Sequence, residues 1–210
     1  LVDYDQEEVS AVEFGYKGLH LDDTLQIFAS IYHYDYDGYQ DELEQFDPIR
    51  GAGANFVSNA NGITNEGFEI EMQYQANDRL NIAGNYSYTK TEYGEDYFVL
   101  TVDDPTNPVA VFGQCTQGYV SCEDDNPAFV TDYTVNLKGG PLKGIPEDKL
   151  TLNITYEMDS RWGPIWLFAT HSYTGAFSAS GVQRDLDRIE SVSYTHLRAH
   201  ETRGNLVCRL

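Results

Sequence analysis

Residues 62–93, GITNEGFEIEMQYQANDRLNIAGNYSYTKTEY, carry the clearest strand pattern in the chain. It predicts two β-strands joined by a very short turn at Asn77-Asp78-Arg79, whose polar residues suit a tight hairpin. In both strands apolar or aromatic residues alternate with polar ones, so each strand has one apolar and one polar face. The apolar set is Phe68, Ile70, Met72, Tyr74, Leu80, Ile82, Tyr86 and Tyr88.

Two architectures fit this alternation. One is a soluble antiparallel sheet with one wet face. The other is a transmembrane β-barrel with apolar side chains toward lipid and polar ones toward a watery lumen. Three features favour the barrel: tyrosines gather at the strand ends away from the short turns, short turns alternate with long polar loops, and the strands have the length of about ten residues that crosses a bilayer when tilted. The sequence therefore predicts an all-β fold, an antiparallel transmembrane β-barrel segment.

The barrel interpretation assigns a place to individual side chains. Residues expected to face the lumen are Glu69, Glu71, Gln73, Asn81 and Asn85. The two glutamates lie about 7 Å apart on one face, but nothing else in the sequence supports hydrolysis by a carboxylate pair. Amphipathic rings collect where lipid headgroups meet water. The residues expected to form such an aromatic girdle are Tyr32, Tyr34, Tyr36, Tyr86, Tyr88, Trp162 and Trp166.

Short motifs follow one another through the central hairpin. Asn61-Gly62 precedes a Gly-x-Glu-x-Glu strand that starts at Gly67, and Leu80 precedes a Tyr-Ser-Tyr-Thr end at 86–89; a Gly-Ile-Pro segment at 144–146 comes before a later strand. In order and spacing this series resembles the C-terminal part of the β-barrel of TonB-dependent outer-membrane receptors. The resemblance covers residues 1–190, which we expect to form one partial barrel of about six to eight strands.

The resemblance implies a larger barrel of about 22 strands with an N-terminal plug. It implies a place in the outer membrane of a Gram-negative bacterium and import of a scarce nutrient, of the siderophore, vitamin or oligosaccharide class, with energy supplied by TonB. The implied partners are the TonB complex, reached through a plug region outside this chain, lipopolysaccharide and other outer-membrane lipid, and a small-molecule ligand. The alternative function is a soluble or cell-surface β-sandwich binding module without transport activity.

Two long polar segments, 41–65 and 94–127, are expected to be loops that face the ligand. The second contains Cys115 and Cys122, which we expect to form a disulfide in an exported protein. Its acidic residues could bind Ca²⁺ or bridge to lipopolysaccharide, although a solvated surface is the expectation. Further strands are predicted at 10–21, 24–39, 129–137, 150–156 and 165–173.

Composition excludes some classes of protein. The 210 residues carry a formal net charge of -21, which argues against a nucleic-acid partner because phosphate binding needs clustered Lys and Arg. The sequence contains no run of 18 apolar residues that would form a transmembrane helix. The histidines His20, His33 and His171 have no spaced partner, and no catalytic motif appears. We therefore predict no enzyme activity, no cofactor and no metal site.

The last residues, 191–210, differ in origin from the rest. VSYTHLRAHET, residues 192–202, is the translation of a transposase sequencing adapter in one reading frame, and LVCRL, residues 206–210, is that of a flow-cell sequence. We therefore expect residues 191–210 to be an adapter-derived, non-native tail, in which His196, His200 and Cys208 carry no chemistry. The chain also begins in the middle of a strand pattern, which we interpret as a missing N-terminus.

This interpretation predicts the sequence of the native locus. Amplification and sequencing past codon 190, by a method that uses no transposase adapter, should show the frame continuing through more alternating strands to a terminal aromatic residue. Codons for VSYTHLRAHET in the genomic DNA would contradict it.

Overall fold

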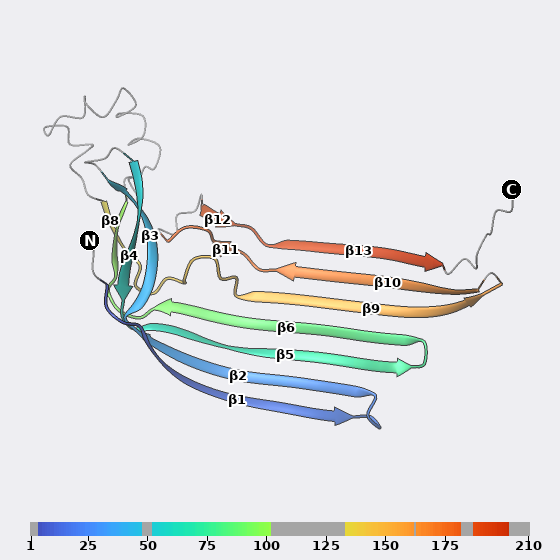
Figure 1. The fold of residues 1–210 in the computed structure, drawn as a ribbon. Helices are drawn as coiled ribbons and strands as arrows, with labels where there is room; N and C mark the ends of the chain where they lie inside the picture. Colours follow the sequence, from blue (N-terminus) through green and yellow to red (C-terminus); the bar gives the residue numbers. More distant parts are fainter. Residues whose placement is uncertain (1–3, 48–51, 102–132, 162, 182–186, 202–210) are drawn as a thin grey trace, which may run out of the picture.

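Antiparallel β-strands make up most of the structure. The computed structural model describes residues 4–47, 52–101, 133–161, 163–181 and 187–201. A seven-stranded sheet runs in the order β1-β2-β5-β6-β9-β10-β13 (Figure 1). Its strands are β1 (Glu8–His20), β2 (Leu25–Asp37), β5 (Ile63–Asn77), β6 (Leu80–Tyr93), β9 (Asp148–Ser160), β10 (Gly163–Thr174) and β13 (Val192–Glu201). The all-β, antiparallel fold and the count of six to eight strands are confirmed.

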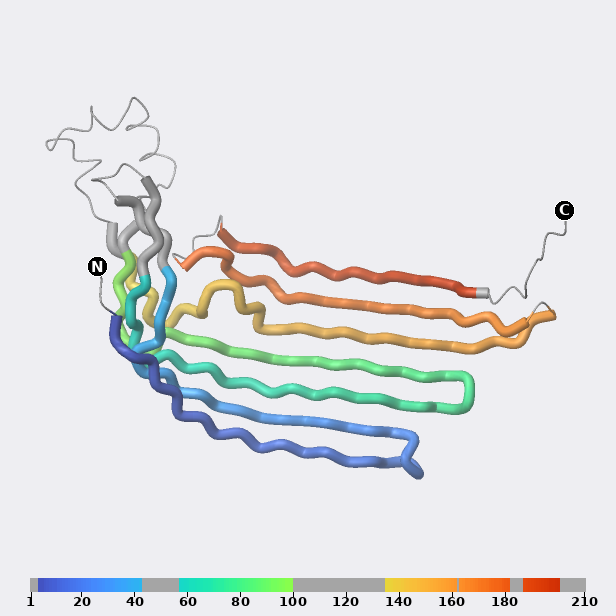
Figure 2. Tube along the Cα trace, viewed as in Figure 1, coloured from blue at the N-terminus to red at the C-terminus, as the bar shows by residue number. Residues whose placement is uncertain are grey.

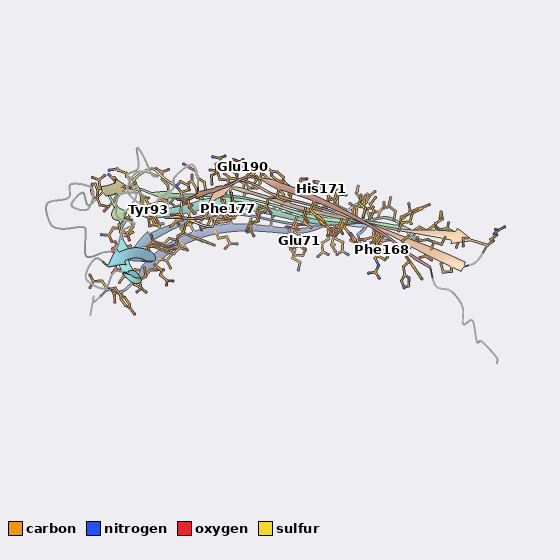
Figure 3. All side chains as sticks on the ribbon, turned by 90° about the horizontal axis from the view of Figure 1, so that it is seen from above. Glu71, Tyr93, Phe168, His171, Phe177 and Glu190 are labelled. Atoms are coloured by element: carbon orange, nitrogen blue, oxygen red, sulfur yellow. The ribbon has the colours of Figure 1, made fainter. Side chains whose placement is uncertain are left out.

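Three two-stranded sheets accompany this wall. They are β3 (Tyr39–Asp47) with β4 (Ala52–Ala60), β7 (Phe98–Thr101) with β8 (Tyr133–Asn136), and β11 (Phe177–Ser178) with β12 (Arg188–Ile189). The first two stand upright at one end of the wall (Figure 1). Seen from above, the wall is a single layer, and in the described part of the chain no second sheet covers it as a β-sandwich would require (Figure 3). Among the same residues, no helix is long and apolar enough to cross a membrane.

The short turns all lie at the other end of the wall (Figure 2). In the β1–β2 turn, Leu21, Asp22 and Asp23 adopt the left-handed conformation, with φ of 52°, 53° and 66°. The Thr24 hydroxyl closes this turn by donating to the Leu21 carbonyl at 2.7 Å. In the β5–β6 turn, the Asn77 Oδ1 accepts from two backbone N–H groups that follow it, at 2.9 and 3.1 Å. The predicted rhythm of three hairpins with short turns on one side is therefore confirmed.

The strand register gives the wall two different faces, because residues paired across an antiparallel sheet share a face. We call one the apolar face; a row that crosses it is Tyr16, Ala29, Ile70, Tyr86, Leu150 and Tyr173. We call the other the polar face; the row beside the first is Lys17, Phe28, Glu71, Asn85, Thr151 and Ser172. The alternation of apolar and polar residues in the sequence therefore produces one apolar and one polar face across six strands of the wall.

The apolar face is open rather than packed. Phe14 is 73% exposed and Ile31 60%, and Phe68 and Ile70 remain about two-fifths exposed at 42% and 41%. From Leu80 to Tyr88, β6 rises about 27 Å, or about 20 Å of height when tilted by about 40°. This is most of the apolar band of about 25 Å that a barrel presents to lipid. Uncovered apolar surface of this extent marks an interaction with lipid or protein.

The predicted loops contain more structure than expected. The segment 41–65 holds most of the β3–β4 hairpin and the start of β5, so the prediction of a continuous loop there is wrong. In the segment 94–127, β7 forms, and residues 102–132, with Cys115 and Cys122, lie outside the described residues. The strand predicted at 129–137 is β8, which pairs with β7 and not with the wall. A local hairpin pairs backbone groups that a long irregular loop would leave to water, which explains both corrections.

A small core lies at the end of the wall where the two upright hairpins stand, which we call the loop end. Its buried members are Ala60, Ile63, Tyr93, Tyr97, Val99, Leu137 and Leu142, and we call them the loop-end core. Ile63 and Tyr93 are fully buried, at 0% exposure. Ile63 is the first residue of β5 and Tyr93 is the last of β6, so the wall strands themselves enter this core. Both upright hairpins therefore rest on the ends of the wall strands.

Candidate functional site

The five residues predicted to face the lumen share the polar face. Glu69 pairs with Ser87, Glu71 with Asn85 and Gln73 with Ala83, and Asn81 pairs with Gln75. The Asn81 Nδ2 donates to the Gln75 Oε1 at 2.9 Å. Basic residues share this face: Lys149 pairs with Ser87 on β6, and Lys17 sits 4.6 Å from the Phe28 ring centroid. The polar face therefore carries acidic, basic and amide side chains together.

The predicted aromatic girdle is divided between the two faces. Tyr86 and Tyr88 lie on the apolar face, with ring centroids 5.7 and 5.9 Å from that of Phe68. Tyr32, Tyr34 and Tyr36 pair with Gly67, Asn65 and Ile63, which places them on the face of Glu69. Trp166 pairs with Glu157 and lies on that face too, while Trp162 is outside the described residues. A single belt that faces lipid therefore cannot contain both groups, and the prediction of one belt is wrong.

Strand parity explains this correction. In β2 the aliphatic residues Leu25, Ile27 and Ile31 have odd numbers, whereas the three tyrosines have even ones. Successive side chains of a strand point to opposite faces, so the two groups cannot both face lipid. The odd and even positions of these residues in the sequence already carry this signal.

The tyrosines on the polar face form a column. The Tyr32 and Tyr34 rings stack with centroids 5.1 Å apart, and the Tyr34 hydroxyl donates to Glu13 at 3.4 Å. The Tyr32 hydroxyl lies 3.0 Å from the Thr89 Oγ1, across Gly67. A Cβ at Gly67 would meet the Tyr88 carbonyl oxygen at 2.1 Å and the Tyr32 hydroxyl at 2.7 Å. The glycine therefore makes room for the ring above it.

Charged residues replace apolar ones where the apolar face approaches the loop end. We call His33, Asp35, Glu66, Lys90 and Glu92 the charged cluster. His33 and Lys90 both pair with Glu66, in the row after Ile31, Phe68 and Tyr88. Lys90 Nζ lies 3.2 Å from the Glu92 carboxylate. These groups are about half exposed, so their ion pairs add little stability. Within the described ranges no group of three or more His, Cys, Asp or Glu could hold a metal ion.

A buried polar group lies beside the loop-end core. Asp41 is 2% exposed, and the Tyr93 hydroxyl donates to its Oδ2 at 2.9 Å. Lys143 Nζ lies 3.1 Å from the Asp41 Oδ1 and also donates to the Glu42 carbonyl. Burial, and then the charge of Asp41, raise the pKa of Tyr93 well above its usual range. We call Asp41, Tyr93 and Lys143 the clasp. The sequence gives no signal of it beyond an acidic residue in an expected loop.

The sequence of residues 2–200 matches the family model described as "TonB dependent receptor-like, beta-barrel". The chain belongs to this family of β-barrel receptors. Its place is therefore the outer membrane of a Gram-negative bacterium, as expected. No curated protein sequence matches the chain.

Solved structures agree at the level of the fold. The ferric yersiniabactin uptake receptor FyuA from Yersinia pestis is 13% identical, with a TM-score of 0.56 over 92% of this chain. The siderophore receptor PiuA from Acinetobacter baumannii is 17% identical, with a TM-score of 0.56 over 93% of this chain. The copper transporter OprC is 14% identical, with a TM-score of 0.57 over 92% of this chain. The chain spans 22% of the length of each of these proteins.

The Tyr32–Gly67 contact leads to a prediction for a receptor that carries this segment. Gly67→Ala should destabilise the folded barrel by about 1–3 kcal/mol, because the new methyl group overpacks against backbone and ring. Gly15→Ala is the matched control, since its Cβ would meet only the Ala29 carbonyl oxygen, at 3.9 Å. Urea titration of the refolded protein in lipid vesicles measures both. Equal midpoints for the two variants would show that the space above Gly67 is not constrained.

Proposed function

We propose that this chain is part of an outer-membrane active-transport receptor, which binds a scarce nutrient and imports it with energy supplied by TonB. The observation that carries the proposal is the two-faced wall in a chain of the TonB-dependent receptor family. The similar folds of a ferric-siderophore uptake receptor, a siderophore receptor and a copper transporter make metal complexes the first ligands to test. Vitamins and oligosaccharides are the other classes. A transport protein of this kind performs no covalent chemistry.

In this proposal the polar face lines the lumen. Glu69, Glu71, Gln73, Asn81 and Asn85 face water and the plug, through which the receptor reaches the TonB complex. Mixed carboxylates, amides and lysines keep such a wall hydrated, as the lumen of a barrel requires. The column of Tyr32, Tyr34 and Tyr36 then stands on the lumen side, just below the loop hairpins. The segments 41–65 and 94–127 are the proposed ligand-facing parts, with Cys115 and Cys122 joined in a disulfide.

The apolar face lies against lipid in this proposal, with Tyr86 and Tyr88 near its outer border. The charged cluster follows at the depth of the headgroups. There Lys90 can donate a hydrogen bond to a lipopolysaccharide phosphate, which is a strong acceptor for a cationic donor.

We also propose that residues 191–210 do not belong to the native barrel. In β13 the apolar face carries Ser193 and Thr195 next to Tyr173 and His171, and then Leu197 and Ala199 next to Ala169 and Leu167. The proposal therefore rests on the adapter-like order of residues 192–202 and 206–210, and sequencing of the locus tests it.

Arginine substitutions test which face meets lipid. Met72→Arg on the apolar face should cost about 2–4 kcal/mol of folding stability, the penalty for a cation near the bilayer midplane, because Met72 pairs with Gly84, halfway between Leu80 and Tyr88. Gln73→Arg on the polar face is the matched control and should change the stability by less than about 1 kcal/mol. Both are measured by urea titration in lipid vesicles, with the shift in unheated gel mobility as the readout of folded barrel. Equal costs would mean that the apolar face does not contact lipid.

Uptake assays test the transport step. Cells expressing the full receptor should accumulate radiolabelled ferric yersiniabactin, another ferric siderophore or copper(II), and accumulation should stop when TonB is deleted while surface binding persists. The control is the same strain with an empty vector. Uptake that continues without TonB would contradict active transport and indicate a passive pore.

A further inference from the structure

We propose that the clasp fastens both loop hairpins to the wall, so that Asp41 is the positioning residue for the surface they present. The idea rests on the proposed function in one respect, namely that this surface faces the ligand. The argument itself depends on burial, hydrogen bonds and topology at the loop end, and its test needs no ligand.

The burial of Asp41 requires specific partners. A carboxylate removed from water is costly unless its charge is paired and its oxygens accept hydrogen bonds. Each Asp41 oxygen has its own donor: Oδ2 accepts from the Tyr93 hydroxyl and Oδ1 faces Lys143 Nζ. Removing one donor leaves a buried acceptor unpaired, so the arrangement holds only while all three residues stay in place.

The three residues come from three different parts of the chain. Asp41 lies in β3, Tyr93 ends the wall strand β6, and Lys143 lies in the segment between β8 and β9. That segment is bound to β6 by backbone bonds, since Tyr93 donates to the Gly140 carbonyl at 3.0 Å and its own carbonyl accepts from Gly139 at 2.8 Å. The clasp therefore ties the β3–β4 hairpin to a segment that is already fixed on the wall.

Tyr93 serves the second hairpin as well. Its ring stacks on that of Tyr97 at 5.5 Å, with an angle of 11° between the planes. Tyr97 leads into β7, and its carbonyl accepts from the Leu137 backbone N–H at 2.9 Å, just after β8. One side chain thus contacts both hairpins, through its hydroxyl on one side and its ring face on the other. Loss of the hydroxyl should release β3–β4 while β7–β8 stays stacked.

Tyr93→Phe isolates this role, because it removes the hydroxyl and keeps the ring. The matched control is Tyr86→Phe on the same strand, since the Tyr86 hydroxyl also donates to an aspartate, Asp148, at 2.5 Å but lies on the apolar face of the wall. Proteinase K is applied to intact cells that display the full receptor. A hydrogen bond to a charged group is worth about a tenfold change in an opening equilibrium, so cleavage within 41–60 should be about tenfold faster in Tyr93→Phe. Tyr86→Phe should match the wild type.

Spin labels provide the second readout, which a purely stabilising contact would not change. Labels at Gln40 on β3 and Phe98 on β7, introduced as cysteines, report the distance between the hairpins in the full receptor. Tyr93→Phe and Lys143→Met should each broaden this distribution, and the double variant should broaden it no further, because either loss opens the same contact. Unheated gel mobility should stay that of a folded barrel.

Two outcomes overturn the proposal. One is equal cleavage rates for Tyr93→Phe and Tyr86→Phe. The other is faster cleavage with an unchanged distance distribution, which would make the clasp a local stabiliser without a positioning role. Failure of the uptake assay would refute the proposed transport and leave these two measurements intact.

Discussion

The pairing of backbone N–H and C=O groups across the wall is the constraint on which the rest of the structure depends. Lipid offers these groups no partner, so a strand that crosses a membrane must find all of them in neighbouring strands. From β1 to β10 the register runs without interruption except at the bulge between Gln75 and Asn77, next to a turn. Once pairing is complete, side-chain parity alone sorts the residues between lipid and lumen.

Parity also shows how far the sequence predicts this fold. Alternation in β5 and β6 is strong enough to predict both faces, the short turns and the shared face of Glu69, Glu71, Gln73, Asn81 and Asn85. The tyrosines of β2 do not share a face with Tyr86 and Tyr88, and their residue type does not reveal this because tyrosine suits a membrane interface on either side of a strand. The type of a residue indicates how deep it lies in the membrane. Only its odd or even position along the strand indicates which face it is on.

The loop end was predictable to a smaller degree. Acidic and amide residues from Asp41 to Asn59 have low strand propensity, so the β3–β4 hairpin leaves little periodic signal. The clasp joins residues 41, 93 and 143, which no spacing rule connects. The clasp forms only because the folded wall brings these three residues together at its loop end. The sequence does not show this proximity. A buried aspartate in a run of acidic residues looks the same as its neighbours in sequence.

Tyr93 belongs both to a wall strand and to the loop-end core, and this has a mechanical consequence. A strand of a closed barrel has little freedom to tilt, because every neighbour would lose register with it. A hairpin that is bound to the last residue of such a strand is therefore restrained as well. The bases of the two upright hairpins should therefore move together with the wall strands, and larger motions should be confined to parts of the hairpins farther from Tyr93.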